Sequence, residues 1–143
     1  MSLPKNESAF DFSHVGELTG KKYEGTFSVK CMLSIADKRI LEIEKSRLTA
    51  DLQNPTGNLS ALGSVVANLR VRVINAPDWF NQSILSLDIL DEEVIFELYS
   101  ECLNKSEEWR SAVKDKAEKK MAEEAGIGAE GNAPKESKAS SPQ

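Results

Sequence analysis

The sequence is poor in the residues that metal sites and nucleophilic centres require. It has a single histidine, His14, and two cysteines, Cys31 and Cys102, which lie far apart along the chain. A zinc site needs clustered histidine, cysteine and carboxylate ligands, and a Ser–His–acid triad needs a histidine beside its nucleophile. Nothing around His14 meets either requirement, so we expect it at the surface or at a strand edge. The sequence therefore predicts no metal site and no catalytic residue.

Glycine-rich phosphate loops are missing as well. The chain contains neither Gly-x-x-x-x-Gly-Lys nor Gly-x-Gly-x-x-Gly, the spacings that cradle nucleotide phosphates, so no cofactor is expected. Acidic clusters occur at residues 91–93, 107–108 and 123–124. Acid–base catalysis by paired carboxylates needs desolvated groups with separated pKa values, whereas these clusters fall at a helix start or on exposed faces. Capping and solvation explain them better, and the sequence does not indicate an enzyme.

Long hydrophobic runs and an excess of positive charge are also absent. No apolar run approaches the roughly 18 residues that span a bilayer, and the polar N-terminus lacks the apolar core of a signal peptide. The net charge is -5, with both signs mixed throughout, which disfavours binding to phosphate backbones. We therefore expect a soluble cytosolic protein that binds neither membrane nor nucleic acid. In that setting Cys31 and Cys102 are expected to be buried free thiols, not a disulfide.

Alternating apolar residues near the N-terminus predict a β-hairpin. The alternation runs from residue 23 to residue 33 and comprises Tyr23, Phe27, Val29, Cys31 and Leu33. Such a period of two indicates a half-buried strand, in which Gly25 predicts a bulge. A poorer alternating run covers residues 10–18, and Gly20 lies between the two runs at a position suited to positive φ. Because an isolated hairpin is marginally stable in water, its apolar face should rest on helices.

A first helix is predicted directly after the second strand. Ser34 is the expected N-cap, with Asp37 three residues later in the arrangement of a capping box. The helix should extend to about Leu52, before a strong break at residues 54–58. Its expected buried stripe consists of Ile35, Ile40, Leu41, Ile43, Leu48 and Leu52.

Two further helices are predicted between residues 59 and 109. One begins near Leu59 and ends before Pro77, because a proline forces the preceding residue out of the α region; its apolar face comprises Leu59, Leu62, Val65, Val66, Leu69, Val73 and Ile74. After an apolar link, Asp91 is the expected N-cap of the third helix. That helix should bury Val94, Ile95, Leu98, Cys102 and Trp109 on one side.

Together these elements predict an α+β fold, with an N-terminal β-hairpin packed on a mostly α-helical, three-helix domain. Residues 1–9 are expected to be a flexible terminus and residues 10–110 a single globular domain. Residues 111–125 predict a charged helix that projects into solvent, either as a solvated helix end or as an arm that docks onto a partner. Gly126 and Gly128 should end that helix, and the polar, low-complexity residues 126–143 are expected to be disordered.

The aromatic residues of the helical part are the candidate protein-binding residues. Trp79 and Phe80 follow Pro77, and Trp109 lies among charged neighbours on the third predicted helix. As core residues they would seal the ends of the second and third helices, which is the interpretation we favour. As interface anchors they would fit the enrichment of tryptophan at binding hot spots, and Trp109 is the better candidate for that role.

Two segments resemble a family of small proteins encoded in the tail gene blocks of long-tailed bacteriophages. Residues 16–30, Gly-Glu-Leu-Thr-Gly-Lys-Lys-Tyr-Glu-Gly-Thr-Phe-Ser-Val-Lys, look like the family's N-terminal strand signature. Residues 75–80, Asn-Ala-Pro-Asp-Trp-Phe, followed by residues 91–103, look like its ending of a proline, an aromatic pair and an aspartate-led helix. The resemblance spans roughly residues 16–110. Family members often carry Trp-Trp where this chain has Trp79 and Phe80.

Many members of that family are described as tail assembly chaperones, and the resemblance implies the same function here. Such a chaperone binds the long, aggregation-prone tape-measure protein, helps tail tube subunits polymerise around it, and is absent from the mature virion. The resemblance thus implies a non-enzymatic protein of the host cell cytoplasm, with the tape-measure and tail tube proteins as partners. A structural virion protein, such as a minor tail or head–tail joining component, is the alternative. A small enzyme or regulator would need a clustered polar pocket that the sequence does not indicate.

Overall fold

The computed structural model describes residues 3–50 and 57–131, with side chains as far as residue 123. The fold is α+β, as predicted from the sequence. The chain divides into two compact units, which we call the globular unit (Lys5–Trp109) and the arm unit (Met1–Pro4 and Arg110–Gln143). All buried core residues of the described chain belong to the globular unit.

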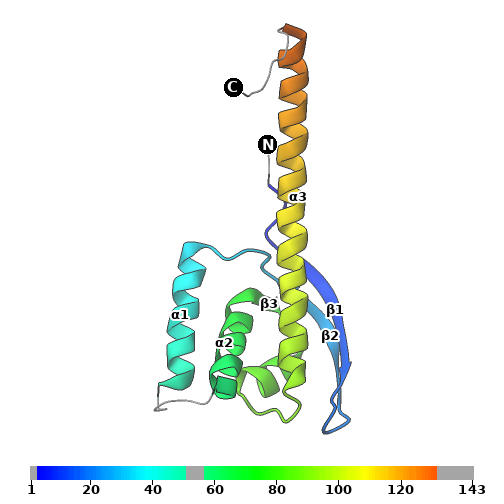
Figure 1. Cartoon of the computed structure of the whole chain (residues 1–143). Coiled ribbons are helices and arrows are strands. Elements are labelled where there is room, and N and C mark those ends of the chain that lie inside the picture. The colour runs from blue at the N-terminus through cyan, green and yellow to red at the C-terminus, as the bar shows by residue number, and fades with distance from the viewer. Residues whose placement is uncertain (1–2, 51–56, 132–143) are drawn as a thin grey trace. The chain divides into compact units, whose positions relative to one another are not determined.

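The predicted hairpin is present at the start of the globular unit (Figure 1). Strands β1 (Ser8–Val15) and β2 (Lys22–Val29) pair in antiparallel register, with Phe10 opposite Phe27. The turn between them includes Gly20, whose φ of 73° confirms the expected left-handed position. Alternate residues of both strands face the core, as period-two patterning requires; the inward set is Phe10, Phe12, Tyr23, Phe27 and Val29.

A third strand, β3, replaces the predicted end of the second helix. Helix α2 (Gly57–Arg72) stops five residues before Pro77, and β3 (Val73–Asn75) pairs antiparallel with β2 beyond it. The prediction that Val73 and Ile74 belong to the apolar face of this helix is therefore wrong. β-Branched residues such as Val73 and its neighbour Ile74 favour strands, and the open side of β2 supplies their hydrogen-bonding partner.

Gly25 also has a different role from the one predicted. The register of β1 and β2 is regular through the pair Phe12–Gly25, and the irregularity of the sheet lies instead between Ser28 and Val29, where β2 pairs with β3. Gly25 has a φ of 153°, and a Cβ built on it would meet Cγ of Pro77 at 2.7 Å. The glycine thus gives the proline ring room to approach the sheet.

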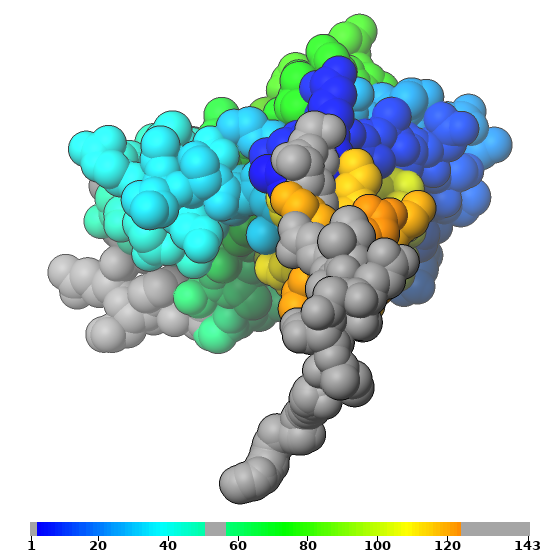
Figure 2. Space-filling view, turned by 90° about the horizontal axis from the view of Figure 1, so that it is seen from above, coloured from blue at the N-terminus to red at the C-terminus, as the bar shows by residue number. Residues whose placement is uncertain are grey.

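Helix α1 (Ile35–Thr49) has the predicted beginning but not the predicted buried face. Ser34 and Asp37 form the expected capping box. Of the predicted stripe only Leu41 is buried, and Leu48 packs against the edge of the core, while Ile35, Ile40 and Ile43 are exposed. The cause is position: α1 packs against α2, and Figures 1 and 2 show it on the opposite side of the globular unit from β1 and β2. Leu52 lies outside the described residues.

The core is closed by α2, a short π-helical turn η1 (Phe80–Leu85) and the first part of α3 (Glu93–Gly131). Val94, Ile95, Leu98 and Cys102 are buried as predicted for the third helix, whereas Trp109 is only half-buried. The expectation for the two cysteines is confirmed, since both are free and buried. Burial raises the pKa of the Cys102 thiol to about 12, so this thiol stays protonated and unreactive at neutral pH.

The arm unit is described by the second part of α3 and by Leu3 and Pro4. The predicted helix end at Gly126 is wrong, because α3 continues to Gly131. A single glycine inside a helix costs only about 1 kcal/mol relative to alanine, and alanines flank both Gly126 and Gly128 in the sequence at positions 125 and 129. Residues 132–143, the remainder of the predicted disordered tail, lie outside the described residues.

Candidate functional site

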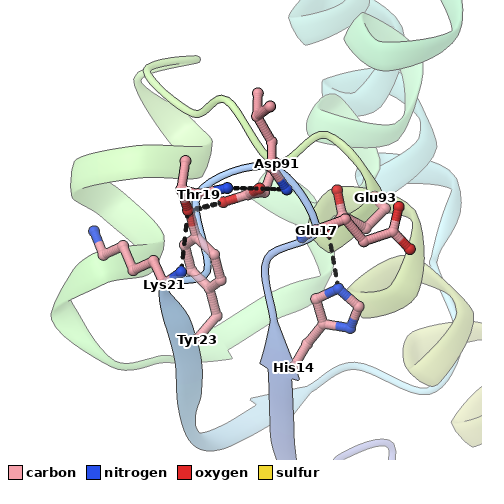
Figure 3. A network of polar contacts seen from close by, with 8 residues as sticks. His14, Glu17, Thr19, Lys21, Tyr23, Asp91 and Glu93 are labelled. Carbon is pink, nitrogen blue, oxygen red and sulfur yellow. Dashed lines mark hydrogen bonds and ion pairs between the residues drawn. The ribbon is translucent and has the colours of Figure 1, made fainter.

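The most concentrated polar cluster of the globular unit surrounds Asp91, just before α3. The Asp91 side chain is fully buried and accepts four hydrogen bonds from the hairpin (Figure 3). Its Oδ1 accepts from the amides of Leu18 and Thr19 at 2.8 and 3.0 Å. Its Oδ2 accepts from the hydroxyls of Thr19 and Tyr23 at 2.5 and 2.9 Å. We call Asp91 and these three hairpin residues the Asp91 knot.

The hairpin turn is shaped to receive this carboxylate. The amide of Gly16 donates to the carbonyl of Lys21 at 2.8 Å, and the amide of Gly20 donates to the carbonyl of Gly16 at 2.9 Å. These bonds curl the turn so that the amides of residues 18 and 19 point toward Asp91. A Cβ on Gly16 would lie 2.2 Å from Asp91 Oδ2, so residue 16 must be glycine for the carboxylate to fit.

The electrostatics of the knot favour an ionised Asp91. The hydroxyl of Thr19 and the amides of Thr19 and Leu18 lower the pKa of Asp91 to about 2, against the opposing effect of burial. Burial, together with the neighbouring Asp91 charge, raises the pKa of Tyr23. At neutral pH Asp91 is therefore a charged acceptor and Tyr23 a neutral donor. A carboxylate held this far below neutrality is a poor general base, and its four hydrogen bonds tie the hairpin turn to the start of α3.

Glu93 extends the contact between the hairpin and α3. His14 Nε2 lies 3.0 Å from Glu93 Oε2, and the amide of Glu17 donates to the same oxygen at 2.7 Å. These two bonds lower the pKa of Glu93. His14 lies on β1, as expected, but it is half-buried and paired instead of solvated. Among the described residues, no group of three or more histidine, cysteine or acidic side chains could hold a metal ion.

The predicted capping role of Asp91 is wrong, although Glu93 lies in the first turn of α3 and Glu92 is exposed, as predicted. The sequence predicts that Asp91 caps the third helix, but its side chain reaches back to a turn more than 70 positions earlier in the chain. At the start of the helix the amide of Val94 donates to the carbonyl of Asp91, and the amide of Ile95 donates to the carbonyl of Glu92. No local pattern distinguishes a buried aspartate of this kind from an N-cap, because its partners are long-range.

The candidate protein-binding residues occupy different environments. Trp79 and Phe80 both pack against Phe27, with ring centroids 5.6 Å away in each case. The indole of Trp79 donates to the carbonyl of Glu24 at 2.8 Å, and Phe80 is only 2% exposed. The favoured core interpretation therefore holds for Phe80 and for most of Trp79. Trp109 is half-buried on α3, and its role as an interface anchor stays a prediction.

The segments that carry the family resemblance meet in space at three points. Asp91 binds the turn of residues 16–21, Trp79 binds Glu24, and Pro77 packs on Gly25. Each contact joins residues 16–30 to residues 75–91, so these contacts fix the hairpin on the rest of the globular unit. No helix among the described residues is long and apolar enough to cross a membrane. Searches of family models, curated proteins and solved structures found no match to this chain.

Proposed function

We propose that this chain is a non-enzymatic tail assembly chaperone of a long-tailed phage, which binds the tape-measure protein and aids assembly of the tail tube around it. In this role it acts in the host cell cytoplasm and leaves before the virion is complete. We propose this particular function because residues 16–30, 75–80 and 91–103 resemble that family.

The observation that carries the proposal is the convergence of those three segments. A resemblance between scattered residues gains weight when those residues contact one another in the folded chain. Here the Asp91 knot, the bond from Trp79 to Glu24 and the close approach of Pro77 to Gly25 all join the segments.

The use of the ionisable groups supports a binding protein over a catalyst. Glu93 pairs with the single histidine, and both Asp91 and Glu93 use their carboxylate oxygens to accept hydrogen bonds from hairpin amides and side chains. Their pKa values are lowered, not raised, whereas a general acid at neutral pH needs a raised value. These groups hold a small domain together, and a chaperone of this size needs such a domain.

Quantitative mass spectrometry of purified particles and of lysates from the producing cells tests the proposal. We expect the tape-measure and tail tube proteins in the particles, and this chain only in the lysate, where it should co-purify with the tape-measure protein. A fixed copy number of this chain in the finished particle would contradict the chaperone and would favour the structural virion protein.

A further inference from the structure

The outer edge of β1 is an open hydrogen-bonding surface. β1 lies at the edge of the sheet and pairs with β2 alone among the described residues (Figure 1). The amide of Gly16 donates to the carbonyl of Lys21, which sets the alternation of the ladder between β1 and β2. In an antiparallel ladder every second residue bonds across the pair, and the residues between point their amides and carbonyls the other way. The residues of β1 that point away from β2 are Ala9, Asp11, Ser13 and Val15, and all four are exposed.

The opposite side of the sheet is protected, whereas β1 is not. Beyond β2, the indole of Trp79 donates to the carbonyl of Glu24, Pro77 packs on Gly25, and the edge strand β3 is only three residues long. Proteins shield sheet edges with such short strands, or with lysine, proline or bulges. β1 is eight residues long, contains no lysine, arginine or proline, and keeps a regular register with β2 throughout. An edge of this length without a shielding device is a template for another strand.

The residues of β1 are complementary to those of a second β1. Two copies related by a two-fold axis present the same strand to each other. An axis at Phe12 pairs Asp11 with Ser13 of the second copy, so that each carboxylate faces a hydroxyl donor. The same axis pairs Ala9 with Val15 of the second copy, and Val15, which is 56% exposed, gains an apolar neighbour. An axis at Asp11 would instead place two carboxylates opposite each other, which destabilises a sheet.

The ends of the strand are compatible with this register. The residue pair that would follow the last one is Glu17 with Glu7 of the second copy, two like charges. The amide of Glu17, however, donates to Glu93 at 2.7 Å, and this bond draws the turn toward the start of α3. Lys5 Nζ lies 3.7 Å from Glu7 Oε1 and offsets part of its charge. The pairing therefore covers β1 and stops before these residues meet.

We propose that β1 is a homodimerisation strand, through which two copies of this chain pair antiparallel about a two-fold axis at Phe12, so that the sheet continues from one copy to the other. The proposal rests on the sheet edge and does not depend on the proposed function. Each outward-pointing residue of β1 exchanges its bonds to water for bonds to the second copy. The two symmetric contacts between Asp11 and Ser13 select the register.

The test is sedimentation equilibrium of the full chain at loading concentrations from about 1 µM to about 1 mM, a range that includes weak specific association. The variants are Ser13→Pro, Ser13→Asp and Ser13→Lys. A proline is tolerated on an edge strand where the amide that it removes faces solvent, so Ser13→Pro removes a bond of the dimer and none of the hairpin. Ser46→Asp and Ser46→Lys are the matched controls, because Ser46 is also exposed but lies on α1. Thermal unfolding of each variant is measured at the lowest concentration.

We expect a wild-type dimer that Ser13→Pro weakens by about tenfold or more, because the ladder is interrupted in both copies. Ser13→Asp should weaken it by about fivefold and Ser13→Lys should strengthen it by about fivefold, since either residue faces Asp11 of the second copy twice. The Ser46 variants should dimerise as the wild type does. If thermal unfolding shows that Ser13→Pro does not fold, the two charged variants decide the outcome.

Hydrogen exchange followed by NMR locates the contact. The amides of residues 9, 11, 13 and 15 should become protected as the concentration rises, and those of α1 should not. A wild type that is monomeric at about 1 mM overturns the proposal, and dimerisation that requires removal of residues 132–143 assigns the edge to that segment instead. A folded Ser13→Pro that dimerises like the wild type overturns β1 as the interface. A dimer that Ser13→Lys dissociates overturns the axis at Phe12.

Discussion

Replacing Gly16 with alanine should destabilise the globular unit strongly, for a reason that has nothing to do with glycine's flexibility. The φ of Gly16 is not among the positive values of the chain, which belong to Gly20, Gly25 and Leu87. The new Cβ would instead lie 2.2, 2.3 and 2.7 Å from Oδ2, Cγ and Oδ1 of Asp91. Contacts this short cannot exist, so either the turn or the carboxylate must move.

The magnitude follows from the hydrogen bonds that this movement breaks. Asp91 Oδ1 lies 2.8 and 3.0 Å from the amides of Leu18 and Thr19, and a shift of about 1 Å takes both beyond hydrogen-bonding distance. A hydrogen bond to a charged group contributes roughly 1.5–3 kcal/mol. Because these amides are only partly buried and water can replace part of the loss, we expect Gly16→Ala to lower the free energy of unfolding by about 3 kcal/mol.

Gly20→Ala is the matched control within the same turn. Gly20 has a φ of 73°, and a Cβ added there meets nothing within 4 Å. Its replacement should lower the free energy of unfolding by only about 1–2 kcal/mol, the cost of a left-handed alanine. Urea unfolding followed by far-ultraviolet circular dichroism measures both variants. The reasoning is refuted if Gly16→Ala is as stable as the wild type or more stable than Gly20→Ala, because the turn would then not need to fit around the carboxylate.

Three further predictions concern stability. Leu69→Ala should lower the free energy of unfolding by about 2–5 kcal/mol in urea titrations, since Leu69 is completely buried; a neutral result would remove α2 from the core. The free energy of unfolding should fall as the pH drops from about 4 to about 2. In the unfolded chain Asp91 takes up a proton near its ordinary pKa of 3.8, whereas in the folded chain it stays ionised down to its pKa of about 2, so acid favours the unfolded chain over this range. Asp91→Asn should flatten this part of the profile, and an unchanged slope would contradict the assigned pKa. Removal of residues 127–143 should leave the thermal midpoint unchanged, and a drop of more than a few degrees would show that they pack on the rest.

Local patterns in the sequence were sufficient for the hairpin, the start of α1 and the buried face of α3. The alternation of Tyr23, Phe27 and Val29 specifies which face of β2 is buried, and the pair Ser34 and Asp37 specifies where α1 begins. Both signals depend only on residues that are close together in the sequence. The structure confirms each one.

Features that depend on distant partners could not be predicted. Residues 73–75 continue the helical periodicity of α2, but the open side of β2 makes them a strand. Asp91 precedes a helix as an N-cap does, but the hairpin turn supplies four donors that bind its side chain instead. Ile40 and Ile43 have the spacing of a buried stripe, but nothing in the described chain covers the outer face of α1.

Co-expression of this chain with the tape-measure protein from its own genome is the most direct test of the proposed chaperone function. The account predicts that the tape-measure protein is insoluble when expressed alone, and that it stays soluble and co-purifies with this chain when the two are made together. A tape-measure protein that aggregates equally with and without the wild-type chain would contradict the account.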